Sequence, residues 1–188
     1  MWAKVESGSV TEIYTRPKQL TIGNTQYPRN IFELWSSSEL EAIGIYEVIE
    51  DNTNFKDQGY YFNTNQSFTF ASGKVTATYG TATAMSLDDS GSGETLVRGL
   101  KYRHKADINN QAASLLSKHD WMSIREAEGG TDMPSNIKTW RGEIRSMANS
   151  MCTKIDNASS VDALAALYVY NTANPPLRPL EEFPAEPS

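Results

Sequence analysis

The sequence predicts an α+β protein in which a small antiparallel sheet unit with one short helix precedes a helical hairpin and an extended proline-rich arm. Strand-like alternation is confined to residues 1–87, and apolar side chains at helical spacing are confined to residues 96–173. The stretch DDSGSG at 88–93 separates them, and its small polar residues suit a flexible linker or an exposed turn. We therefore expect an N-terminal domain over 1–87, a linker over 88–95, a helical domain over 96–173 and an arm over 174–188.

The N-terminal domain is predicted to consist of short strands joined by turns. Residues 2–6 and 10–14 alternate apolar and polar side chains around Ser7-Gly8-Ser9, which predicts a β-hairpin. The further expected strands are 20–22, 26–27, 45–50, 60–63, 67–71 and 74–79. One helix is expected, because Ser36 and Glu39 fit a capping box and Gly44 suits a left-handed helix end.

The strands of residues 60–79 are rich in aromatic side chains at alternate positions. Such a pattern is typical either of the sheet's own core or of a face that binds glycans, and we favour the core. Tyr60 and Tyr61 are adjacent, so one of the two rings is expected to point outward.

The helical domain is predicted to contain two long helices and a third, short one. The first spans 96–118, and the second carries a single apolar seam. The residues of that seam are Ile137, Trp140, Ile144, Met147, Met151 and Ile155. Ser135, preceded by Pro134, is the expected N-cap of the second helix, and a loop that begins at Asp120-Trp121 is expected before it. The third helix is expected to open at Ser159-Ser160.

The arm contains five prolines between Pro175 and Pro187, which exclude helix and central strand. Leu177, Leu180 and Phe183 recur at every third residue and would share one face of a polyproline helix. An extended chain with an apolar stripe suits a groove, which belongs either to the arm's own helices or to a neighbouring subunit. We favour the neighbouring subunit, because little chain remains to cover the arm.

Composition and charge exclude several classes of function. The net charge of −6 without a basic run argues against nucleic-acid binding, and no apolar segment is long enough for a signal peptide or a membrane span. Cys152 is the single cysteine, so neither an intrachain disulfide nor a cysteine zinc cluster is possible. We therefore expect folding in a cytoplasm, without nucleic acid, membrane, metal or cofactor.

No residue pattern establishes catalysis. His119-Asp120 is more typical of a polar helix end than of an oriented base, and two histidines in the chain leave few ligands for zinc. The adjacent carboxylates at 88–89 and 181–182 lie in segments expected to be exposed, and nothing marks them as a glycosidase pair. GSG at 91–93 lacks the GK[ST] ending of a phosphate loop, and no G-x-S-x-G serine elbow occurs. The sequence therefore predicts no enzyme.

Two parts of the chain resemble small tail-associated proteins of tailed bacteriophages, the tail-fibre assembly and tail-accessory proteins, particularly those of marine phages. The N-terminal likeness covers residues 11–51, with the pair Tyr27-Pro28, Trp35 and the sequence ELEAIGIY. The C-terminal likeness is with the helical module of these proteins. It rests on Leu115-Leu116, Asp120-Trp121, Pro134, Trp140-Arg141, Arg145 and Phe183-Pro184.

This resemblance implies a non-enzymatic structural adaptor that joins tail-fibre or baseplate components in the virion. The alternative is a tail-fibre assembly chaperone that is absent from the mature particle, and a tail-borne depolymerase or lysozyme ranks last. The implied partners are other phage tail or fibre proteins, with self-association as a further option, and the implied location is the virion tail after assembly in the host cytoplasm. The expected partner-binding residues are Trp121, Trp140, Arg141, Arg145, Leu177, Leu180 and Phe183.

Overall fold

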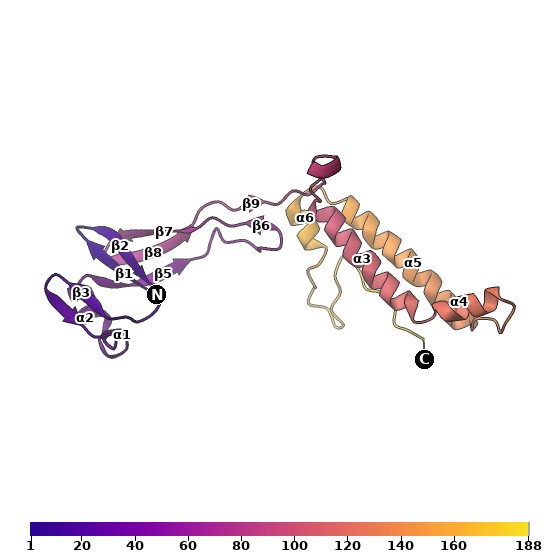
Figure 1. Ribbon diagram of the computed structural model, residues 1–188, viewed down its shortest axis with the longest axis horizontal. Coiled ribbons are helices and arrows are strands. Elements are labelled where there is room, and N and C mark those ends of the chain that lie inside the picture. Colours follow the sequence, from indigo (N-terminus) through magenta and orange to yellow (C-terminus); the bar gives the residue numbers. More distant parts are fainter. Residues whose placement is uncertain (188) are drawn as a thin grey trace. The chain divides into compact units, whose positions relative to one another are not determined.

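A computed structural model describes residues 1–187, which form two compact units (Figure 1). The first unit is Met1–Thr83, and the second begins at Ala84. The first is built on a sheet and the second on helices, so the α+β class is confirmed. No helix in the described part of the chain is both long enough and apolar enough to cross a bilayer.

The first unit contains a five-stranded sheet of order β2-β1-β5-β8-β7 and a separate β3–β4 hairpin. Its strands are β1 (Trp2–Glu6), β2 (Ser9–Tyr14), β3 (Leu20–Ile22), β4 (Thr25–Tyr27), β5 (Ile45–Asp51), β6 (Tyr61–Phe62), β7 (Gln66–Ala71) and β8 (Lys74–Tyr79). A further short strand, β9 (Thr83–Ala84), pairs with β6. The sheet curls into a half-barrel, which brings the edge strands β2 and β7 close together.

The expectation of a purely antiparallel sheet is wrong. β1–β2, β1–β5 and β7–β8 pair antiparallel, but β5 and β8 pair parallel, with Val48 opposite Val75. A parallel pair needs a long crossover, and the chain between residues 51 and 74 supplies one that includes β7. The strands could be predicted from the sequence. The parallel pairing of β5 with β8, however, depends on where the chain returns to the sheet after the crossover.

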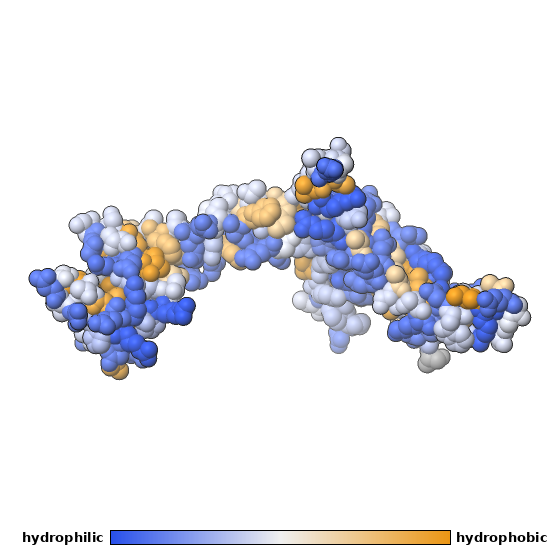
Figure 2. Space-filling model, in the orientation of Figure 1, coloured by the Kyte–Doolittle hydropathy of each residue, from blue (hydrophilic) through white to orange (hydrophobic). Residues whose placement is uncertain are grey.

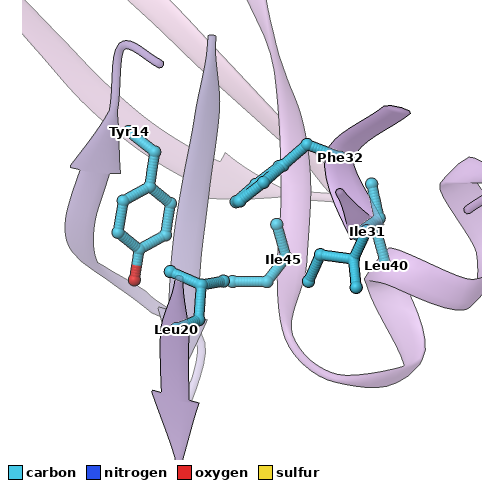
Figure 3. Close-up of a cluster of buried hydrophobic side chains, with 6 residues drawn as sticks. All are labelled: Tyr14, Leu20, Ile31, Phe32, Leu40 and Ile45. Carbon is cyan, nitrogen blue, oxygen red and sulfur yellow. The ribbon is translucent and has the colours of Figure 1, made fainter. Parts of the chain in front are cut away.

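At β1 the sheet has a core on each face, because alternate side chains of this strand enter different cores. Trp2 packs against the core on one face, and Ala3 lies in the core on the other. The first core comprises Tyr14, Leu20, Ile31, Phe32, Leu40 and Ile45 (Figure 3). The second, inside the half-barrel, comprises Ala3, Val48, Val75 and Ala77, with Phe68 and Phe70 packed against them. The aromatic strands therefore supply the sheet's own core at these two phenylalanines.

Two short helices, rather than the single one expected, cover the first core: α1 (Ile31–Leu34) and α2 (Ser37–Ala42). The predicted capping box opens α2, because the Ser36 hydroxyl accepts from the Glu39 amide while the Glu39 carboxylate accepts from the Ser36 amide at 2.8 Å. α1 was not expected from the sequence, and its single turn buries Ile31 and Phe32.

The second unit is a pair of long helices with shorter helical pieces around them. These are a 3-10 turn (Gly93–Thr95), α3 (Leu100–Ser117), α4 (Asp120–Ala127), α5 (Ser135–Asp156) and α6 (Val161–Ala166). α3 and α5 lie antiparallel, because Lys105 reaches Asp156 at one end of the pair while Arg141 reaches Leu116 at the other. The predicted seam of α5 is confirmed: all six side chains are buried except Met147, which is half-buried.

The segment 88–95 forms an exposed turn that is hydrogen-bonded to the start of α3. The Asp89 carboxylate accepts the amide of Gly99 at 2.8 Å, and Ser90 and Val97 exchange two backbone hydrogen bonds. α3 consequently begins at Leu100 and not at residue 96.

At α5, Ser135 is the first helical residue, and Pro134 occupies the cap position without a side-chain cap, so the expected N-cap is wrong. At α6 the expected start is confirmed, because the Ser160 hydroxyl accepts the amide of Ala163.

Gly44 closes α2 in a crowded left-handed conformation, and we expect its replacement to destabilise the first unit. Its φ is +80°, and a Cβ there would lie 2.9 Å from the carbonyl oxygen of Val5. Gly8 has a similar φ of +79° but open space around the position. Gly44→Ala should therefore lower the free energy of unfolding by at least about 1 kcal/mol more than Gly8→Ala, measured by urea denaturation. Equal losses in the two variants would contradict the close approach of Gly44 to β1.

Candidate functional site

A buried arginine ties together three helices of the second unit. Arg141 of α5 is 5% exposed. One guanidinium nitrogen donates to the carbonyl of Leu116 in the last turn of α3, and another donates to the Asp120 carboxylate at the start of α4, at 2.7 Å. The last carbonyls of a helix lack partners within it, so Arg141 satisfies one of them while pairing its own charge. The backbone oxygen of Arg141 in turn accepts from exposed Arg145 at 3.3 Å.

The adjacent tryptophan holds the arm. Trp140 is 3% exposed, and the ring of His119 meets it edge-on at 5.7 Å between centroids. Its indole N–H donates to the carbonyl of Pro184 at 3.0 Å. A buried indole needs such an acceptor, and the proline-rich arm supplies one that no regular element uses.

The arm lies on its own helices, which is the alternative we did not favour from the sequence. Leu180 is fully buried, and its amide donates to the carbonyl of Leu167 at 2.9 Å. Lys154 of α5 donates to the carbonyl of Pro179 at 2.8 Å. The expected common apolar face is wrong, because Leu177 is 59% exposed while Phe183 is half-buried.

A charged group secures the end of the arm. The Glu186 carboxylate lies 2.8 Å from His119 Nε2 and 3.2 Å from Lys118 Nζ. The hydrogen bond from His119, followed by that from Lys118, lowers the pKa of Glu186. The second ring nitrogen of His119, Nδ1, is buried without a hydrogen-bond partner among the described residues. His119 thus binds the arm.

Helix α4 replaces the loop expected from Asp120 onward. Trp121 and Ile124 are 53% and 58% exposed, and the Arg125 guanidinium lies 4.9 Å from the centre of the Trp121 ring. Figure 2 shows apolar surface over α4. The helix ends in a Schellman motif, in which the amide of Gly129 donates to Glu126 and that of Gly130 to Arg125, at 3.1 and 2.9 Å. The paired glycines therefore stop α4 sharply.

A second exposed apolar region follows α6, at the opposite end of the α3–α5 pair (Figure 1). We call it the loop surface and define it by Val169, Tyr170 and Leu177, which are 65%, 51% and 59% exposed. A hollow of about 590 Å³ opens between them, floored by Ala166 and Pro179. Asn171 joins the two ends of the loop. Its backbone N–H donates to the Leu177 carbonyl at 2.8 Å, and its side-chain oxygen accepts the Leu177 backbone N–H at 2.9 Å.

Arg178 stiffens the base of this loop. Its guanidinium lies 5.6 and 5.5 Å from the ring centres of Tyr168 and Tyr170, and it pairs with Glu182 at 2.6 Å. At the same end of the unit, His104 Nδ1 lies 2.8 Å from the Tyr168 hydroxyl, and burial lowers the pKa of His104. The loop surface is thus built on a network of aromatic rings and charges.

The residues expected to bind partners fall into two groups, one on α5 and the arm and one exposed at the ends of the unit. Trp140, Arg141 and Arg145 lie together on α5, with Phe183 and Leu180 on the arm beside the helices. Trp121 and Leu177 are exposed at opposite ends of the unit. Near Trp121 and Leu177, sequence reasoning missed the exposed side chains of Ile124, Val169 and Tyr170. For Ile124, the spacing of three from Trp121 was an available signal.

Comparison with protein-family models, with curated proteins and with solved structures gives no match for this chain. Within residues 1–187, no group of three or more His, Cys, Asp or Glu side chains is placed to hold a metal ion.

We expect replacement by alanine to destabilise the chain much more at Trp140 than at Trp121. Trp140→Ala removes a buried ring and the bond to Pro184, and should lower the free energy of unfolding by roughly 3–5 kcal/mol. Trp121→Ala removes an exposed ring and should cost less than about 1 kcal/mol. Chemical denaturation of both variants measures the difference, and a similar small loss in both would show that Trp140 does not anchor the unit.

The stabilising effect of Glu186 should depend on pH in a defined direction. Its pKa is lowered from 4.5 in the folded chain, so its contribution is fully present above pH 4.5 and is lost as pH falls through the lower folded value. The melting temperature of the native chain should therefore exceed that of Glu186→Gln at neutral pH, and the two should converge on acidification. The exposed Glu143→Gln variant serves as control, and a gap that widens in acid would contradict this assignment.

Proposed function

We propose that this chain is a non-enzymatic tail protein of a tailed bacteriophage, a structural adaptor that joins tail-fibre or baseplate components in the virion. The observation that carries the proposal is the convergence of the residues behind the resemblance. Leu116, Asp120 and Arg141 form one hydrogen-bonded junction, and Trp140 binds Pro184 beside it. Residues that carry the resemblance as separate short motifs therefore lie together in the folded chain. We expect this if the helical module is of the same kind as in the phage tail proteins.

An adaptor needs surfaces for its partners, and each unit offers exposed apolar side chains. On the first unit, Leu34 and Phe62 are 73% and 62% exposed. On the second, the loop surface combines aromatic and aliphatic side chains around a hollow, with Arg178 beneath it. Tyrosine and arginine are enriched among the residues that dominate protein–protein binding energy. We therefore assign the loop surface to a tail or fibre protein.

The direct test of the adaptor function is mass spectrometry of purified phage particles. Peptides of this chain should be present in a constant ratio to the other tail proteins. Their absence from particles, together with recovery of the chain bound to fibre protein in infected cells, would overturn the adaptor in favour of an assembly chaperone.

The loop surface should be needed for incorporation and not for folding. The double variant Tyr170→Ala/Leu177→Ser should reduce the amount of this chain in purified particles at least about tenfold, since loss of 1.4 kcal/mol of binding has that effect. Val97→Ser is a matched control, because Val97 is 60% exposed and does not line the hollow of the loop surface. Normal incorporation of the double variant, or equal loss in the control, would contradict this role.

A further inference from the structure

Two donors of α5 hold the proline-rich arm by its backbone. Lys154 Nζ donates to the carbonyl of Pro179 at 2.8 Å, and the indole of Trp140 donates to that of Pro184 at 3.0 Å. Leu180, which follows Pro179, is fully buried. Every residue has a carbonyl, and in a proline-rich chain few carbonyls are used within a helix or sheet. The two backbone contacts therefore recognise an irregular, proline-rich chain through groups that do not depend on its side chains.

Basic side chains of the helices bind the two acidic positions of the arm. The Glu181 carboxylate pairs with Lys154 at 2.7 Å, and the Glu186 carboxylate is bound by Lys118 and His119, between α3 and α4. We call the donors of both kinds the arm seat: Lys118, His119, Trp140 and Lys154. The charges of the seat are complementary to an acidic segment, and this complementarity selects one kind of ligand.

The last part of the arm does not fill its place on the helices. A hollow of about 360 Å³ lies between Ala185, Pro187 and the first turns of α5, where its lining includes Asn136 and Thr139. The side chain of Glu186 is 37% exposed, and exposed ion pairs contribute little to stability. Local release of such an end needs far less free energy than unfolding of the whole unit.

We propose that the arm seat binds an acidic, proline-rich segment of another protein, and that the chain's own arm competes for the same place. Proline-rich segments dock in grooves that contain aromatic side chains, and their stiffness reduces the entropy lost on binding. The segment places a carbonyl at the indole of Trp140 and an acidic side chain at Lys118 and His119. This inference goes beyond the adaptor function and does not rest on it.

The tethered arm sets the affinity that a partner segment can reach. A ligand joined through a short flexible linker acts at an effective concentration of about millimolar, and a short loop joins the arm to α6. The apparent affinity for a partner segment is reduced to the fraction of chains whose seat is free. A second copy is disfavoured as the occupant, because it would have to give up the same contacts in its own seat to supply its arm.

Fluorescence anisotropy of a labelled synthetic peptide with the sequence of residues 177–187, titrated with the full chain, tests the proposal. The variant Leu180→Ser/Glu186→Lys removes the buried side chain of the arm and places a cation beside Lys118 and His119. It should bind the peptide at least about tenfold more tightly than the native chain, because its seat is free more often.

Glu186→Lys alone provides a second, milder variant that leaves Leu180 in place. It should bind the peptide at least about threefold more tightly than the native chain, so it decides the outcome if the double variant does not fold. Glu94→Lys makes the same change of charge on the exposed 3-10 turn and should bind the peptide as the native chain does.

The indole N–H and the acidic position of the peptide should both be needed. Trp140→Phe in the Glu186→Lys chain keeps an aromatic ring but removes the donor, and should weaken binding at least about threefold. A peptide with lysine in place of the residue that corresponds to Glu186 should bind at least about tenfold more weakly.

The absence of peptide binding, equal affinity in the native chain and both arm variants, or binding that Trp140→Phe leaves unchanged would each overturn the proposal. An equal gain in Glu94→Lys would also overturn it, because the effect would then be one of net charge. The native chain should sediment as a monomer over the same concentrations. A dimer that Glu186→Lys dissociates would assign the seat to the arm of a second copy instead.

Discussion

The buried guanidinium of Arg141 is the interaction on which the second unit depends. It donates hydrogen bonds to Leu116 at the end of α3 and to Asp120 at the start of α4, and it is buried on α5. A buried charge is costly unless it is fully paired, and removal of one partner typically costs about 3–5 kcal/mol. The next residue, Trp140, extends the same junction to the arm through Pro184. The orientation of α4 and the path of the arm thus follow from two consecutive side chains.

This dependence connects the fold to the proposed function. The junction holds α4, with exposed Trp121, at one end of the helix pair, while Arg178 and Asn171 shape the loop surface at the other. Neither surface requires the arm to bind a neighbour, because the arm is already engaged along its own helices. The arm therefore packs against the helices of its own unit, and Leu180 is its fully buried side chain.

Local signals predicted most elements, and contacts distant in sequence explain the failures. The Ser36 capping box, the α5 seam around Ile144 and the cap at Ser160 depend on neighbouring residues and are present as expected. The parallel pairing of β5 with β8 depends on where a long crossover returns, which no local pattern encodes. α4 was missed because it buries no residue fully, and the course of the arm was missed because donors from distant helices determine it. Of the exposed candidates, Trp121 and Leu177 were named from the sequence, whereas Val169 and Tyr170 follow the last helix without a periodic signal.

Hydrogen exchange of Arg141→Lys is the most direct measurement of whether the arginine junction orders α4. Lysine keeps the charge but lacks the planar fork that reaches Leu116 and Asp120 together. We expect amides of α4 to lose protection in the variant while those around Ile108 in α3 and Ile144 in α5 keep theirs. Unchanged protection in α4, or an equal loss across all three helices, would contradict the central role of this junction.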